Sequence, residues 1–158
     1  MVTLHRPSNV DDASTLALII EELRRISNDI PLVFPVHPRS VSQVKALLGE
    51  GKSDRLQIIP PLGYVDFLGL QKHAMFVITD SGGLQEEATY LNIPCFSVRE
   101  NTERLVTVTH GTNTIVGRNM TLLGEHVRGV LAGKGKAGAI PPFWDGHTSD
   151  RIAKILSN

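Results

Sequence analysis

The chain has few of the features that mark exported or nucleic-acid-binding proteins. Its 158 residues include one cysteine, and 16 Lys and Arg balance 16 Asp and Glu. The lone Cys95 lies in an apolar run, which indicates a buried thiol in a reducing compartment rather than a disulfide. Balanced charge provides no strong positive field for nucleic acid or an acidic membrane surface. We therefore expect a small, discrete ligand.

Long apolar runs are also lacking. No stretch approaches the roughly 20 residues that a membrane span requires, and the chain does not begin with the basic-then-apolar pattern of a signal peptide. These absences predict a cytoplasmic protein that does not bind membranes. The length fits a single domain over residues 1–158.

Short runs rich in valine and isoleucine alternate with segments of helical period. Strands are predicted at 2–5, 32–36, 56–59, 75–79, 95–98 and 114–116. Helices are predicted at 16–26, 41–48, 84–91, 122–131 and 152–156, with a short turn at 66–71. The expected helix caps are a box of Ser40 with Gln43, then Thr121, then Ser149 or Thr148. This pattern predicts the α/β class, a Rossmann-like parallel sheet with helices on both faces.

The segment TDSGGLQEE, residues 79–87, joins a predicted strand to a predicted helix and resembles an anion-binding turn. Ligands of parallel sheets bind beyond the carboxyl ends of the strands, where helix amino termini present unpaired N–H groups. Gly82 and Gly83 let the backbone approach an anion, and Ser81 adds a hydroxyl donor. The alternative is a tight connection capped by Ser81 or Asp80.

Two glutamates follow on the same predicted helix. At about 100° per residue, Glu86 is expected to point into solvent, while Glu87 falls at the edge of the apolar face. There Glu87 could accept hydrogen bonds from two ribose hydroxyls. The alternative is that both carboxylates only complement the helix dipole.

Polar or aromatic groups also follow other predicted strands. His5 and Arg6 place a group that titrates near neutral pH beside a permanent cation. His37 ends the second strand, and segment 60–67 is expected to be a stiff loop whose aromatics could flank a planar base. Segment 99–104 could bracket phosphates. Each also has a structural reading, as a cap, a core aromatic or a salt-bridged loop, but their convergence on one sheet edge favours a ligand crevice.

Together these motifs resemble those of the non-hydrolysing UDP-N-acetylglucosamine 2-epimerases. The matching segments, in order, are 3–6, 36–38, 61–67, TDSGGLQEE at 79–87, RENTER at 99–104 and 111–113. The resemblance implies the carboxyl-terminal half of a glycosyltransferase type B (GT-B) architecture, with the amino-terminal domain absent. It also implies a full-length homodimer that interconverts UDP-N-acetylglucosamine and UDP-N-acetylmannosamine by eliminating and re-adding UDP, without a metal or other cofactor.

The resemblance further implies roles for particular residues. The expected UDP-binding set is Ser81, Gly82, Gly83 and Arg104 near phosphate, Glu87 at the ribose and Phe67 beside the uracil. His5 is the expected catalytic residue, which stabilises or protonates the departing diphosphate. Arg6 and His37 resemble residues that contact a second, activating sugar nucleotide. Because the carboxylates proposed for chemistry at C2 belong to the other half, we expect this chain to bind UDP without turnover.

Three other functions are compatible with much of this pattern. A hydrolysing 2-epimerase would release N-acetylmannosamine and UDP from a similar crevice. The donor domain of a GT-B glycosyltransferase would hold the ribose in the same way, although the RENTER segment argues against it. A non-catalytic module could sense UDP-sugars.

Overall fold

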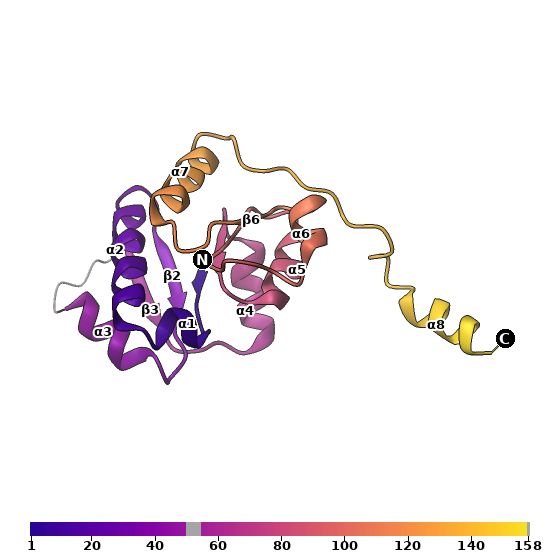
Figure 1. Ribbon diagram of the computed structural model, residues 1–158, viewed down its shortest axis with the longest axis horizontal. Coiled ribbons are helices and arrows are strands. Elements are labelled where there is room, and N and C mark those ends of the chain that lie inside the picture. Colours follow the sequence, from indigo (N-terminus) through magenta and orange to yellow (C-terminus); the bar gives the residue numbers. More distant parts are fainter. Residues whose placement is uncertain (50–54, 158) are drawn as a thin grey trace.

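The computed structural model describes residues 1–49 and 55–157, which contain six strands. They are β1 (Val2–Thr3), β2 (Leu32–Pro35), β3 (Leu56–Ile59), β4 (Val77–Thr79), β5 (Cys95–Ser97) and β6 (Asn113–Ile115). Parallel ladders join β1-β4-β5-β6 and β2-β3. Since β1 also contacts β2, the strands follow the order β3-β2-β1-β4-β5-β6 (Figure 1). This is the Rossmann order, and its direction reverses between β1 and β4.

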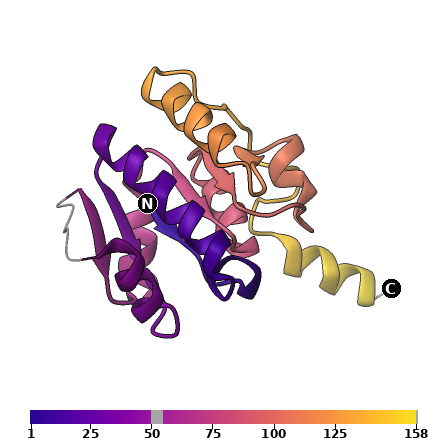
Figure 2. The same ribbon diagram turned by 60° about the vertical axis from the view of Figure 1, so that its left-hand side comes forward.

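Helices cover both faces of the sheet. They are α1 (Pro7–Val10), α2 (Ala13–Asp29), α3 (Val41–Leu48), α4 (Tyr64–Lys72), α5 (Gly82–Tyr90), α6 (Leu105–Thr109), α7 (Met120–Leu131) and α8 (Thr148–Leu156). Helix α2 contacts α1, α3 and α7, and Figure 2 shows α2 and α7 side by side. Helix α5 contacts α6 and strands β4, β5 and β6. The predicted fold class is therefore confirmed.

The core forms where the apolar stripes of the helices meet the sheet. Leu16, Ile19 and Leu23 lie on one side of α2 at helical spacing and are almost completely buried. Every residue of β4 is buried, as expected for a central parallel strand covered on both faces. Burial of each large apolar side chain contributes about 1.5–3 kcal/mol, so this core holds β1 and β4 at fixed positions.

The helix caps differ from the expected ones. Ser40 precedes α3 in a helical conformation, φ −102° and ψ −8°, and makes no side-chain capping bond, so the predicted capping box is wrong. Helix α7 is capped by Asn119, which accepts from the Leu122 amide at 2.9 Å, and not by Thr121. Helix α8 begins at Thr148 after His147 and has no side-chain capping bond. Capping depends on the backbone angles of the residue before the helix, which composition does not specify.

Three helical segments also depart from the prediction. The expected stiff loop over 60–67 ends at Gly63, because α4 begins at Tyr64 and includes the short turn expected over 66–71. Helices α1 and α6 were not predicted. They have four and five residues, too short to display a helical period.

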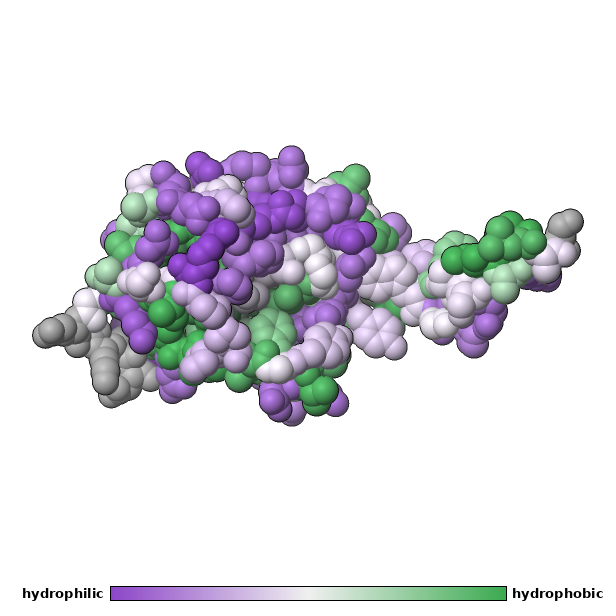
Figure 3. Space-filling view, turned by 90° about the horizontal axis from the view of Figure 1, so that it is seen from below, coloured by the Kyte–Doolittle hydropathy of each residue, from purple (hydrophilic) through white to green (hydrophobic). Residues whose placement is uncertain are grey.

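The carboxyl-terminal helix lies apart from the rest of the molecule. After α7 the chain runs as an extended segment, and α8 projects from the body (Figure 1). No residue of α8 is buried, and Ile155 and Leu156 are 73% and 81% exposed. Figure 3 shows this apolar surface on the projecting part of the molecule.

Within the described ranges, no helix is both long and apolar enough to cross a membrane.

Candidate functional site

Asp80 joins the ends of β1 and β4, at the point where the strand order reverses. Its side chain is 0% exposed, and its carboxylate accepts hydrogen bonds from the backbone amides of His5 and Arg6 and from Nδ2 of Asn9, at 3.0–3.2 Å. Asn9 also donates to the Val98 carbonyl at 2.9 Å. Asp80 thus ties the start of α1 to the carboxyl edge of the sheet.

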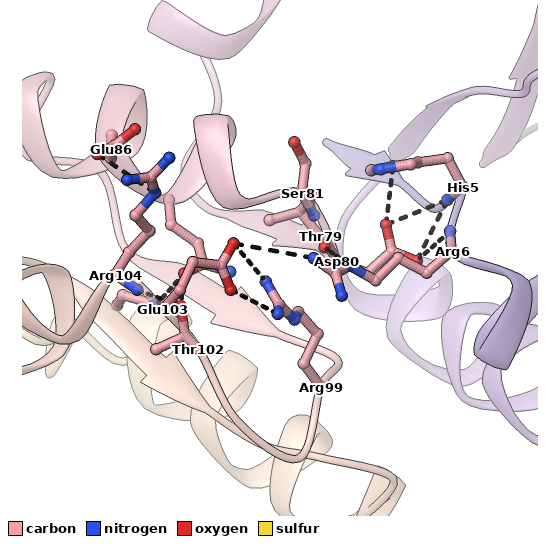
Figure 4. Close-up of polar contacts among 12 residues, drawn as sticks. His5, Arg6, Thr79, Asp80, Ser81, Glu86, Arg99, Thr102, Glu103 and Arg104 are labelled. Carbon is pink, nitrogen blue, oxygen red and sulfur yellow. Dashed lines mark hydrogen bonds and ion pairs between the residues drawn. The ribbon is translucent and has the colours of Figure 1, made fainter.

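The imidazole of His5 completes this cluster. Its Nδ1 lies 2.9 Å from Oδ1 of Asp80, and the imidazole is half exposed (Figure 4). The hydrogen bond to Asp80 raises the pKa of His5 above its usual value, although partial burial opposes the shift. Burial disfavours the charged form of Asp80, but hydrogen bonds from His5, Arg6 and Asn9 outweigh it and lower the pKa of Asp80. The pair therefore favours an imidazolium beside a carboxylate up to a higher pH than an isolated histidine would allow.

The turn after β4 leads directly into α5. The Ser81 amide donates to Oγ1 of Thr79 at 3.0 Å, which fixes the chain as it leaves the strand. Ser81 has an extended backbone, φ −85° and ψ 126°, and makes no side-chain capping bond. The alternative in which Ser81 caps the helix through its hydroxyl is therefore wrong. The first turn of α5 holds no acidic residue, so its amino terminus keeps the partial positive charge that attracts anions.

Glu103 brings a carboxylate to this helix terminus. A Cβ built on Gly82 would lie 2.7 Å from Oε1 of Glu103, so the glycine allows the close approach. Oε2 of Glu103 lies 2.7 Å from Nη2 of Arg99, and Oε1 lies 3.8 Å from Nη2 of Arg6. Figure 4 shows Glu103 between the arginine side chains. The hydrogen bond with Arg99 lowers the pKa of Glu103 to about 2.

Arg104 lies on the other side of Glu103 (Figure 4). Its Nε is 3.5 Å from Oε1 of Glu86, whose side chain is 36% exposed. Glu86 thus reaches solvent, as expected, and its carboxylate also pairs with the predicted phosphate-binding arginine. Thr102 accepts from the Arg104 amide at 3.0 Å and donates to Oε1 of Gln85 at 2.6 Å. The loop that carries Arg104 is therefore anchored to α5 through buried side chains.

Glu87 lies on α5 and contacts α4, the helix that carries Phe67. Oε1 of Glu87 accepts from the Tyr64 hydroxyl at 3.3 Å. With the side-chain amide of Gln71 oriented so that both its nitrogen and its oxygen have partners, Gln71 donates to Oε2 of Glu87 at 2.9 Å. Glu87 lines a pocket of about 420 Å³ together with Tyr64, Leu68, Glu86, Tyr90, Leu91 and Trp144. Phe67 is half-buried on α4.

His37 lies at another part of the sheet edge. It follows β2, is exposed, and accepts a hydrogen bond at Nδ1 from the Arg39 amide at 3.3 Å. The predicted residues thus form three groups. His5, Arg6, Ser81, Gly82 and Arg104 gather around the ends of β1 and β4 with Gly83 exposed beside them. Glu87 contacts Tyr64 on α4, the helix that also carries Phe67, and His37 follows β2.

Sequence reasoning gave no role to Asn9 and Glu103, and it treated Asp80 only as a possible cap. Asp80 did carry a signal, since a carboxylate directly after an apolar strand needs hydrogen-bond donors. Its donors, however, come from residues 71 to 75 positions away. The place of Glu103 depends on how the loop after β5 folds back over Gly82, and no periodicity encodes that path.

Comparison with known proteins agrees with this geometry. The sequence profile of the family described as UDP-N-acetylglucosamine 2-epimerase matches residues 1–157. The chain is 40% identical over 162 residues to UDP-N-acetylglucosamine 2-epimerase of Methanocaldococcus jannaschii, covering 99% of this chain and 44% of that protein. It is 37% identical over 158 residues to UDP-2,3-diacetamido-2,3-dideoxy-D-glucuronate 2-epimerase of Pseudomonas aeruginosa, covering 99% of this chain and 44% of the relative.

Solved structures give the same result. The crystal structure of the M. jannaschii enzyme in complex with UDP-GlcNAc and UDP matches with a TM-score of 0.85 and 39% identity, covering 99% of this chain and 44% of that one. The chain corresponds to the carboxyl-terminal half of these GT-B-like enzymes. It therefore spans less than half the length of the relatives that it matches.

Proposed function

The chain belongs to the UDP-N-acetylglucosamine 2-epimerase family, and from this we propose that it is the nucleotide-binding half of an enzyme that interconverts UDP-N-acetylglucosamine and UDP-N-acetylmannosamine. The reaction would proceed by elimination and re-addition of UDP. The chain alone would bind UDP and would not turn over substrate, because chemistry at C2 requires the half that it lacks.

One observation carries the proposal: α5 begins at the switch point of the sheet without an acidic residue in its first turn, with cations close by. A diphosphate there would receive N–H groups from the start of α5. Ser81, Gly82 and Gly83 would contact its oxygens, and Arg104 would neutralise part of its charge. Ligands of this fold bind beyond the carboxyl ends of the strands.

His5 is proposed as the group that supports departure of UDP. Its Nδ1 pairs with Asp80, and its raised pKa extends the protonated form to higher pH. An imidazolium can donate a proton to, or neutralise, the charge that develops on the leaving diphosphate. The buried Asp80 carboxylate holds the ring in one orientation and leaves Nε2 as the nitrogen for the substrate.

Glu87 and Phe67 are proposed to hold the nucleoside. The Glu87 carboxylate already accepts hydrogen bonds from Tyr64 and Gln71, and carboxylate oxygens have enough lone pairs to accept ribose hydroxyls as well. Phe67 would lie beside the uracil. Arg6 and His37 are proposed to contact a second, activating sugar nucleotide, which would bridge the ends of β1 and β2.

The projecting α8 supports the proposal that a further domain belongs with this chain. Its stripe of Ile152, Ile155 and Leu156 is exposed, although amphipathic helices normally bury such a face. The relatives contain more than twice the length of this chain. We infer that α8 packs against the amino-terminal domain in the full-length enzyme.

Titration calorimetry of this chain with UDP tests nucleotide binding. Ser81→Ala and Glu87→Ala should each weaken binding about tenfold, since each loses hydrogen bonds to a charged or ribose group. Glu125→Ala is a matched control, because Glu125 is exposed on α7. Absence of UDP binding by the unaltered chain would reject the proposal, and unchanged affinity in both variants would reject the assigned roles.

Product analysis on the full-length enzyme tests the reaction. Incubation with UDP-N-acetylglucosamine should give UDP-N-acetylmannosamine, whereas free N-acetylmannosamine with UDP would identify a hydrolysing enzyme. The P. aeruginosa relative supports a second candidate substrate, a UDP-2,3-diacetamido-2,3-dideoxy-glucuronate. Faster epimerisation of that sugar nucleotide would replace the first assignment.

A further inference from the structure

We propose that Glu103 determines the affinity and phosphate selectivity of this site, because its carboxylate occupies the anion position at the start of α5 that the diphosphate must take. This inference rests on the proposed UDP-binding function. The Glu103 carboxylate would compete with the ligand phosphate for this position and would leave the arginines when the nucleotide binds. Neither family membership nor the roles proposed above give Glu103 a function.

The position of the carboxylate supports the competition. Oε1 of Glu103 would be 2.7 Å from a Cβ on Gly82, so it lies against the first residue of α5. The same carboxylate reaches Arg99 at 2.7 Å and Arg6 at 3.8 Å. A phosphate at a helix terminus uses the same two kinds of partner, namely the helix amino end and arginine side chains. Both anions cannot occupy this place.

The surroundings of Glu103 favour its displacement. Its side chain is 52% exposed and lies on the loop before α6, so it can rotate into solvent. Arg99 is only 7% exposed and is held in place. When the Glu103 carboxylate moves away, the buried guanidinium of Arg99 requires a new anionic partner. A ligand phosphate next to Gly82 would supply one.

This competition predicts selectivity by charge. A diphosphate brings more negative charge than a monophosphate and makes more hydrogen bonds, so it replaces the carboxylate more effectively. Uridine carries no phosphate and has no reason to displace Glu103. Loss of the carboxylate should therefore strengthen binding most for UDP, less for UMP and not at all for uridine.

The experiment compares Glu103→Gln and Glu103→Ala with the unaltered chain by titration calorimetry against UDP, UMP and uridine. Glu100→Gln is the matched control, since Glu100 lies on the same loop but its carboxylate approaches Gly117 instead of α5. We expect the Kd for UDP to fall about fivefold to tenfold in both Glu103 variants. UDP would then no longer have to break the ion pair of Glu103 with arginine or displace its carboxylate from the amino end of α5. Thermal unfolding of each protein verifies that it is folded.

The outcomes separate the two proposals. Tighter UDP binding by both Glu103 variants, with unchanged uridine binding and an unchanged Glu100→Gln control, supports the competition. Unchanged or weaker UDP binding in the Glu103 variants overturns this inference while the proposed function stands. If neither the unaltered chain nor the variants bind UDP, the proposed function fails and this inference fails with it.

Discussion

Nδ1 of His5 lies 2.9 Å from Oδ1 of Asp80, although the two residues are 75 positions apart in the chain. The pair joins the ends of β1 and β4, which are neighbours in the sheet. Asp80 is buried, whereas the imidazole is half exposed, so one partner is fixed and the other can meet a ligand. The same contact therefore stabilises the fold and sets the protonation of a proposed catalytic group.

The pKa of His5 should fall when Asp80 loses its charge. In Asp80→Asn the hydrogen bond and the attraction that raise this pKa are weakened, while partial burial continues to lower it. NMR titration of the His5 ring in both proteins measures the change. Asp66→Asn removes an exposed carboxylate on α4 and should leave the pKa of His5 unaltered. An equal pKa in Asp80→Asn and the unaltered protein would contradict the assigned cause.

The contribution of His5 to folding stability should decrease as the pH rises above about 6.5, because its pKa is raised in the folded protein. The folded protein retains the His5 proton at a pH where the unfolded chain has released it, so the contribution is complete below the unfolded value of about 6.5 and is lost above the folded value. Asp80, whose pKa is lowered, loses its contribution only in acid and stays ionised in this range. In urea unfolding from pH 6 to 9, the stability of the unaltered protein relative to His5→Asn should decrease as the pH rises. An identical slope in both proteins would rule out this linkage.

The sequence was sufficient to locate elements whose signal is local. The continuous apolar residues of β4 indicate burial on both faces, and the helical spacing of Leu16, Ile19 and Leu23 indicates burial on one face. The bounds of β4 were therefore predicted within two residues and those of α2 within three at each end. Ser40 had the composition of a cap but the wrong backbone angles. Local composition does not determine those angles, because the preceding strand and loop impose them.

The candidate site was predictable only in part, for a related reason. The glycines at 82 and 83 and the strand-end position of His5 can be recognised in the sequence. The pairing of Arg99 with Glu103, and that of Arg104 with Glu86, depends on the path of one loop over α5. The sequence therefore indicated cations near the anion-binding turn, with a salt-bridged loop as the alternative, but it did not specify which carboxylates pair with them.

Replacement of Gly82 or Gly83 in the anion-binding turn by alanine should affect UDP binding differently. A methyl group on Gly82 would lie 2.7 Å from Oε1 of Glu103 and would obstruct an anion at the start of α5, whereas on Gly83 its nearest neighbour would be Oγ of Ser81 at 4.0 Å. We expect Gly82→Ala to weaken UDP binding at least about tenfold, equivalent to roughly 1.4 kcal/mol. Gly83→Ala should change the affinity less than about twofold and should slightly stabilise α5. Calorimetry with UDP measures both affinities, and an unchanged affinity in Gly82→Ala would contradict the proposed approach of the anion at Gly82.

Helix α8 should contribute little to the stability of this chain. Ile155 is 73% exposed, so Ile155→Ser should change the free energy of unfolding by less than about 0.5 kcal/mol. Leu123→Ala is the contrasting variant, because Leu123 is 0% exposed and its truncation should cost about 2–5 kcal/mol. Urea denaturation of the three proteins makes the comparison.

Hydrogen exchange provides a second measurement on the same helix. The amides of α8 should exchange faster than those of α2, whose apolar face is packed in the core. In the full-length enzyme, Ile155→Ser should instead cost about 1.5–3 kcal/mol, because the proposed amino-terminal domain would bury the side chain. A large loss of unfolding free energy from Ile155→Ser in this chain alone would mean that α8 already packs against the rest of the domain. A negligible cost in both proteins would mean that the missing half does not cover α8.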